Sequence, residues 1–308
     1  MINLLIDRLT ASPLVGVDVG SAACKVVEVS RSGSKVTLRH VGVRLVVGQP
    51  AAVLKRALAE AGVTAGQAAV GLASPEVVVK PFEMPPMPRK ELSAAVLLEA
   101  ESASLNGHTK HEVAMDWQTL ASNPRESIRG LLAVVPRSIV ASRVATVREA
   151  ALEPVVVDVE GLALWNAYWV LRGSHEPEPQ TVFLVNIGAR TTNLVIGHGP
   201  DALMLLRDIQ LGAPISNDAL AQDWLAEIRD SLGYARSKGG LRALDAVHIT
   251  GGGASPRVMP LLQSVVSAPV TIWNPFNTLL RDGRGPWVDE SAGPLFAIAI
   301  GLALRKPS

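Results

Sequence analysis

The sequence is poor in cysteine and in charged residues. Its one cysteine, Cys24, has no partner for an internal disulfide and suits a reducing compartment. Charged residues make up 19% of the chain against 48% hydrophobic residues, and the formal net charge is +1. We therefore expect one or two globular domains with a sizeable core, and no cationic stripe that would bind nucleic acid.

Long apolar runs are also missing. The opening MINLLIDRLTASPL has no cationic flank before a long apolar run, so no signal peptide is evident. The apolar stretch at residues 294–304 is well short of the roughly 20 residues that a spanning helix needs. We expect a soluble, cytoplasmic chain that does not cross a membrane by itself.

The first segment nevertheless has an apolar helical face, formed by Ile2, Leu5, Ile6 and Leu9. Such a face packs on its own domain or belongs to a frayed terminus, or it touches a membrane or a partner. We favour packing on the domain.

An internal repeat organises the chain. Residues 18–27 (DVGSAACKVV) and 186–195 (NIGARTTNLV) align without gaps, and each copy follows a short apolar strand. Turn residues between alternating runs predict hairpins, and the apolar period of residues 51–62 and 217–238 predicts helices. Each half thus reads as β-β-β-α-β followed by more helix, and the two halves would face one another across a cleft.

A linker and an insertion complete this organisation. Residues 173–180 (GSHEPEPQ) predict a break between a first lobe, residues 1–173, and a second lobe, residues 181–308. Residues 75–137 read as a strand, a Met-Pro turn, a helix and two further strands. We predict a two-lobed α/β fold, actin-like and built from a duplicated ribonuclease H-like unit, with a small α+β insertion in the first lobe.

Polar residues in the first repeat copy could bind phosphate. Asp18 at the strand end is placed to hold a Mg²⁺-bound water, Ser21 could donate its hydroxyl, and Lys25 could bring a cation to the phosphates. One such turn is as typical of an ordinary hairpin with a permissive glycine. Two copies in register favour the phosphate site.

Three consecutive glycines add a third signal. Gly251, Gly252 and Gly253 follow an apolar strand and precede a predicted helix at residues 255–266. Consecutive glycines let the backbone approach a flat ring, and a helix start offers unpaired N–H groups. Combined with the duplicated hairpin, this turn predicts an actin-like nucleotide site.

The sequence resembles the PilM family of the actin-like ATPase superfamily along nearly its full length. The similar segments are VGVDVGSAACKVVEV, EMPPMPRKELSAAVLLEAESAS, the connector helix VVVDVEGLALWNA, ITGGGASPRVMPLL, and WNPF with GPLFAIAIGLALR. The resemblance implies ATP with Mg²⁺ as ligand, with Asp18 toward the metal. It implies phosphate contacts at Asp18, Gly20, Ser21, Lys25, Gly188 and Thr191, with Asn186 in the same cofactor site. It also implies adenosine contacts at Gly251, Gly252 and Gly253, and Glu160 as the connector acid near the attacking water.

Two departures from the family pattern weaken this site. Asn186 stands where an aspartate is usual, and a neutral amide is a poorer partner for Mg²⁺ than a carboxylate. The segment between Gly188 and Gly251 is also too short for the helical subdomain that covers one wall of the adenine pocket. We therefore predict weak ATP binding and very poor ATPase activity.

The resemblance also implies a partner. It predicts a platform or adaptor protein of type IV pilus assembly, held at the inner face of the inner membrane. This protein would bind the cytoplasmic N-terminal peptide of a bitopic PilN-like membrane protein in a groove between the first lobe and the insertion. An ATP-dependent kinase and an FtsA-like polymerising ATPase remain alternatives, and a GspL-like secretion protein would continue into a membrane helix.

Overall fold

The computed structural model describes residues 14–33, 35–102, 111–120, 127–172, 180–213, 218–281 and 288–305. The apolar face predicted for Ile2, Leu5, Ile6 and Leu9 lies outside these residues, as does most of the linker at 173–180. Within the described ranges, every helix is too short or too polar to span a bilayer.

The first sheet carries the first copy of the repeat. Its strand order is β14-β3-β2-β1-β4-β8. The strands are β1 (Leu14–Val19), β2 (Ala23–Ser32), β3 (Lys35–Leu45), β4 (Gln67–Leu72), β8 (Glu153–Val159) and β14 (Leu280–Arg281). Strand β1 pairs antiparallel with β2 and parallel with β4. Helices α1 (Pro50–Ala61) and α3 (Arg137–Glu149) pack on this sheet, and α1 and α3 contact each other.

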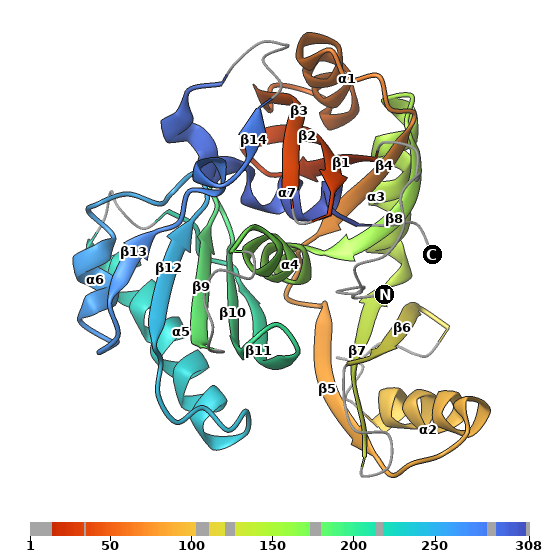
Figure 1. Ribbon diagram of the computed structural model, residues 1–308, viewed down its shortest axis with the longest axis vertical. Helices are drawn as coiled ribbons and strands as arrows, with labels where there is room; N and C mark the ends of the chain where they lie inside the picture. The colour runs from red at the N-terminus through yellow and green to blue at the C-terminus, as the bar shows by residue number, and fades with distance from the viewer. Residues whose placement is uncertain are drawn as a thin grey trace.

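The second sheet repeats this topology, which confirms the predicted duplication. Its order is β11-β10-β9-β12-β13, and β9 pairs antiparallel with β10 and parallel with β12, as β1 does with β2 and β4. The strands are β9 (Thr181–Ile187), β10 (Thr192–His198), β11 (Ala202–Ile209), β12 (Ala246–Thr250) and β13 (Val270–Ile272). Helices α5 (Asp218–Ser237) and α6 (Met259–Gln263) cover it (Figure 1).

Two helices fill the space between the sheets, α4 (Glu160–Arg172) and α7 (Ala297–Ala303) (Figure 1). Leu164 of α4 and Ile298 of α7 share one apolar cluster with Leu184 of β9. Gly301 allows the close helix contact, because a Cβ there would collide with the carbonyl oxygen of Ala163. The two lobes are therefore joined by a continuous core.

The end of the chain returns to the first lobe. The short helix η2 (Pro275–Asn277) precedes β14, which pairs parallel with β3. The short helix η3 (Glu290–Phe296) then leads into α7, which packs on β1, β2 and β4. The division into residues 1–173 and 181–308 stays a prediction about the chain, since contacts of the last elements cross it.

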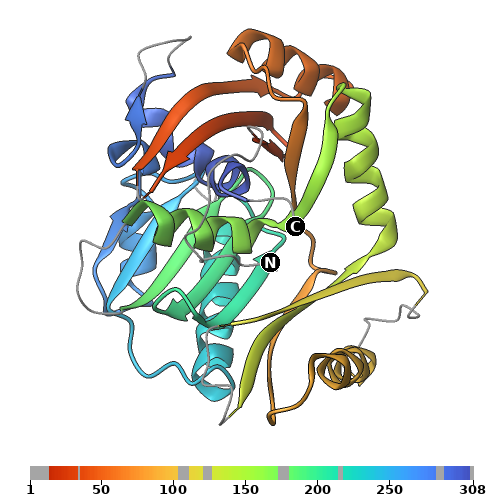
Figure 2. The ribbon, with the colours of Figure 1, turned by 45° about the vertical axis from the view of Figure 1, so that its right-hand side comes forward.

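The insertion forms the small α+β unit that the sequence predicts. It contains β5 (Val78–Met84), α2 (Arg89–Ser102), β6 (Val113–Thr119) and β7 (Ile128–Pro136). The strands make a separate sheet in the order β5-β7-β6, and its core is built from Phe82, Leu92, Val96, Leu132 and Val134. Figure 2 shows this sheet and α2 projecting away from the two larger sheets.

Two sequence interpretations were wrong in detail. Residues 155–159 (VVVDV), expected as part of the connector helix, belong to strand β8, and the helix begins at Glu160. Consecutive β-branched valines fit a strand, and pairing with β4 completes it. The helix expected at residues 255–266 is only Met259–Gln263, and α3 was not predicted.

Candidate functional site

The two repeat copies form equivalent turns. The amide of Gly20 donates to the carbonyl of Ala23 at 3.1 Å, and the amide of Gly188 donates to the carbonyl of Thr191 at 2.9 Å. A Cβ at Gly20 would lie 3.0 Å from the Ala23 oxygen, and a Cβ at Gly188 would lie 2.9 Å from the Thr191 oxygen. Both turns are therefore tight enough to favour glycine. Ser21 is exposed in the first turn.

A buried ion pair occupies the first loop. The carboxylate of Asp18 accepts a hydrogen bond from Nζ of Lys25 at 2.7 Å, and both side chains are nearly inaccessible. Burial lowers the pKa of Lys25, but the charge and hydrogen bond of Asp18 outweigh it, so the pKa is raised. Lys25, predicted to contact phosphate, is thus committed to Asp18 in this structure.

Neutral amides replace this ion pair in the second loop. Asn186 and Asn193 occupy the positions of Asp18 and Lys25, and Nδ2 of Asn186 donates to Oδ1 of Asn193 at 2.6 Å. Nδ2 of Asn193 then donates to Oδ1 of Asp208 at 2.8 Å. The other carboxylate oxygen of Asp208 accepts from the amide of Ser74 at 3.1 Å. This chain of hydrogen bonds links the second loop to the segment that leads into the insertion.

A third buried carboxylate lies between the two loops. Burial, with the nearby carboxylates of Asp18 and Asp208, raises the pKa of Glu160, at the start of α4, to about 8. Burial also raises the pKa of Asp208 to about 6, although the hydrogen bonds from Asn193 and Ser74 lower it. Glu160 is therefore protonated at neutral pH, where the connector acid of a hydrolase would act as a base.

The structure adds two residues that sequence reasoning missed, Asn193 and Asp208. Asn193 lies in the second repeat copy, aligned with Lys25, so the comparison of the copies could have identified it. Asp208 is the second-last residue of an alternating strand, and only the fold shows that it is buried beside the second loop.

The glycine turn packs against the second loop, mainly through its backbone. Gly251 has a φ of +89° and donates its amide to the carbonyl of Pro294 at 3.0 Å. The amide of Gly253 donates to the carbonyl of Ile187 at 2.8 Å. A Cβ at Gly251 would lie 2.7 Å from Oδ1 of Asn186, so close packing alone requires this glycine. Gly252 is exposed.

The predicted role of Asp18 as a metal ligand has no support from a cluster of donors. Within the described ranges, no three side chains among His, Cys, Asp and Glu are close enough together to hold a metal ion. The residues named for ATP still lie near one another, since Asp18 acts on Glu160 and Gly251 packs against Asn186, but the role of each stays a prediction.

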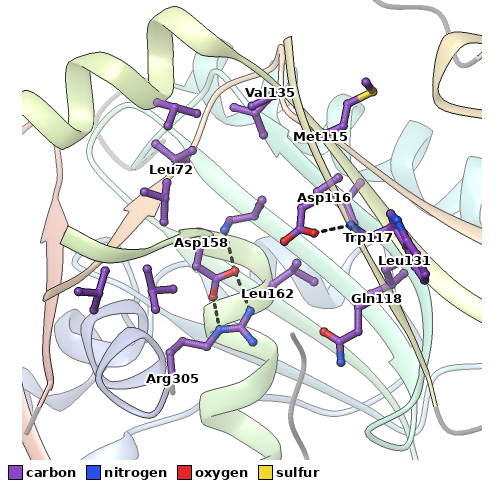
Figure 3. A pocket seen from close by; sticks show the side chains of 18 residues that line it. Leu72, Met115, Asp116, Trp117, Gln118, Leu131, Val135, Asp158, Leu162 and Arg305 are labelled. Carbon is purple, nitrogen blue, oxygen red and sulfur yellow. Dashed lines mark hydrogen bonds and ion pairs between the residues drawn. The ribbon is translucent and has the colours of Figure 1, made fainter. Parts of the chain in front are cut away.

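A second site is a cavity of about 320 Å³ between the first sheet and the insertion (Figure 3). Its walls are strand β8, an edge of the first sheet, and strand β6, an edge of the insertion sheet. Most of its lining is aliphatic, including Leu72, Val79, Leu131, Val140, Val156 and Leu162. The cavity lies where the sequence predicts a peptide groove, beside residues 75–137.

Charged groups in the cavity are few. Arg305 makes a bidentate ion pair with Asp158, with Nε to Oδ2 at 2.5 Å and Nη2 to Oδ1 at 2.7 Å. Their side chains are 9% and 7% exposed. The third charged residue is Asp116 on β6. The cavity therefore combines apolar walls with a small polar centre, as ligand sites commonly do.

Known proteins share this fold. A solved structure described as a PilM-PilN type IV pilus biogenesis complex matches with a TM-score of 0.80 and 25% identity, covering 94% of this chain and 97% of that chain. The ethanolamine utilization protein EutJ from Carboxydothermus hydrogenoformans matches with a TM-score of 0.50 and 15% identity, over 99% and 93% of the two chains. The predicted actin-like duplicated fold is thereby confirmed.

The sequence itself gives the family. Residues 16–231 match the family described as type IV pilus assembly protein PilM. This range includes the first lobe from β1 onward, the insertion, the second repeat copy and most of α5. The chain belongs to the PilM family of type IV pilus assembly proteins.

Proposed function

We propose that this protein is an adaptor of type IV pilus assembly that binds the cytoplasmic N-terminal peptide of a PilN-like inner-membrane protein in the cavity between β8 and β6. The observation that carries the proposal is the match to a PilM-PilN complex, at a TM-score of 0.80, in a chain that has a cavity at the insertion. The protein would lie at the cytoplasmic face of the inner membrane through this partner.

The walls of the cavity suit an extended peptide. Among the described residues, strand β8 pairs only with β4 and strand β6 pairs only with β7, so the other edge of each strand is unpaired there. An added strand can satisfy the N–H and C=O groups of such an edge, and alternate side chains then enter pockets. The aliphatic lining would receive the apolar side chains of the peptide.

Filling the cavity tests this proposal. Ala133 of β7 lines the cavity and pairs with Asp116 and Val79 in the insertion sheet. An Ala133→Trp substitution is expected to weaken binding of the partner peptide by at least about 30-fold. The indole would fill the space that a buried side chain of the bound peptide otherwise occupies. Calorimetric titration with the synthetic N-terminal peptide of the partner measures the loss.

A matched control uses the other side of the insertion. Leu98 of α2 is 68% exposed and does not line the cavity, so Leu98→Trp should leave peptide affinity unchanged. Equal affinity of the Ala133→Trp variant and the parent, with melting temperatures intact, would contradict the location of the site.

The second proposed activity is weak binding of ATP. The turns at Gly20 and Gly188 are both present. However, Lys25 pairs with Asp18, and the amides of Gly251 and Gly253 donate to carbonyl groups of the protein itself. We expect ATP to bind with a dissociation constant roughly in the millimolar range. We also expect Mg²⁺ to change it little, because Asn186 supplies no carboxylate.

Calorimetry with ATP in Mg²⁺ and in EDTA, together with a phosphate-release assay, measures both expectations. Micromolar binding with steady phosphate release would instead favour the kinase or ATPase alternatives. Sedimentation of the protein with nucleotide would identify a polymerising protein.

A further inference from the structure

We propose that the segment bound in the cavity carries a basic side chain among its apolar residues, seated between Asp116 and the Asp158–Arg305 pair. This inference rests on the proposed function, since it names the chemistry of the peptide that the cavity takes. The lining supplies two carboxylates and one guanidinium, so the cavity has one negative charge in excess.

The Asp158–Arg305 pair is already complete. Both carboxylate oxygens of Asp158 accept from Arg305, and Oδ1 also accepts from the amide of Val159 at 2.9 Å. Bidentate pairs of this kind have a fixed geometry and are among the stronger hydrogen bonds in proteins. The two charges of this pair balance each other, so the excess negative charge of the cavity lies on the opposite wall, formed by β6.

The residue that carries this excess charge is Asp116 on β6. Its Oδ1 accepts from the amide of Trp117 at 2.8 Å, and no cation pairs with it within the ranges that the structure describes. Figure 3 shows its carboxylate directed from the β6 wall toward the side of the cavity that carries Asp158 and Arg305. One oxygen of Asp116 is therefore available to a group inside the cavity.

An entirely apolar peptide would be a poor match for this centre. Filling the cavity removes water from Asp116, and burying a carboxylate is costly unless a hydrogen-bonded cation accompanies it. A lysine or arginine side chain supplies that cation and restores charge neutrality. The same complementarity would reject peptides that place an acidic residue at this position.

Peptide variants distinguish the source of the cation. The probe is the synthetic N-terminal peptide of the PilN-like partner, with each Lys or Arg replaced in turn by Gln, and a further peptide with an acetylated α-amino group. One Lys or Arg replacement should weaken binding about three- to tenfold, and acetylation should leave it unchanged. If acetylation alone weakens binding, the cation is the terminal amine and the proposal is wrong.

Changes in the protein provide the reciprocal test. Asp116→Asn should weaken the parent peptide about two- to fivefold, and Asp116→Lys at least about tenfold. Asp116→Lys should recover affinity for the peptide in which the critical basic residue is replaced by Glu. Asp230→Asn, at an exposed position on α5, is the matched control and should have no effect.

The outcomes separate the two proposals. If no peptide binds the parent protein, the proposed function is wrong and the inference is wrong with it. If the parent peptide binds, but neither its basic residues nor Asp116 affects affinity, the inference alone is overturned. Charge-reversed pairs that bind no better than the single changes would also overturn it.

Discussion

Replacing Glu160 with glutamine is expected to stabilise the folded protein by about 3 to 5 kcal/mol at pH 9, and by about 1 kcal/mol or less at pH 5. Glutamine has the size of the protonated glutamate and cannot ionise. The effect therefore measures the cost of ionising a buried carboxyl group, which has the carboxylates of Asp18 and Asp208 nearby.

The direction of the pH dependence follows from the pKa. Burial raises the pKa of Glu160 from 4.5 to about 8 in the folded protein. The folded chain thus holds this proton more tightly than the unfolded chain. Its contribution to stability is fully present below pH 4.5 and is lost as the pH rises to about 8. Above that pH, parent and Glu160→Gln should differ by a constant amount.

Urea denaturation of both proteins at several pH values, in EDTA, measures this difference. A control at the neighbouring group is Asp208→Asn, which should lower the pKa of Glu160 because the carboxylate of Asp208 raises it. Stability profiles of parent and Glu160→Gln that stay parallel from pH 5 to pH 9 would contradict the buried, protonated state of Glu160.

Restoring the aspartate that the family usually has, by Asn186→Asp, is expected to destabilise the protein by about 1 to 3 kcal/mol. Nδ2 of Asn186 donates to Oδ1 of Asn193, so a carboxylate there would face an acceptor. Rotation of the Asn193 amide would correct this contact, but it would turn Oδ1 toward the carboxylate of Asp208. The single change thus leaves one buried polar contact unsatisfied.

A second substitution should repair this defect. In the first loop the equivalent positions hold the ion pair of Asp18 and Lys25, so Asn186→Asp with Asn193→Lys would rebuild that pair in the second loop. We expect the double variant to recover at least about half of the lost stability in urea denaturation. A single Asn186→Asp variant as stable as the parent would show that the hydrogen bond with Asn193 is unimportant.

The sequence by itself determined the repeated unit and the insertion. The two copies at residues 18–27 and 186–195 place Gly20 and Gly188 in equivalent turns, and the patterns of residues 75–137 give β5, α2, β6 and β7. These features are local, because strand alternation, helical periodicity and turn glycines act over a few residues. Where local patterns were ambiguous, as for the valines of β8, pairing with β4 decided the outcome.

Only the tertiary structure decided what the sites contain. Ser74 and Asp208 are 134 residues apart, yet their hydrogen bond joins the second lobe to the base of the insertion. The pKa of Glu160 depends on burial between the lobes, and the cavity depends on two strand edges from different sheets. Arg305 reaches Asp158 because the end of the chain crosses back to the first lobe. Such contacts follow from how distant segments pack, and no local pattern encodes them.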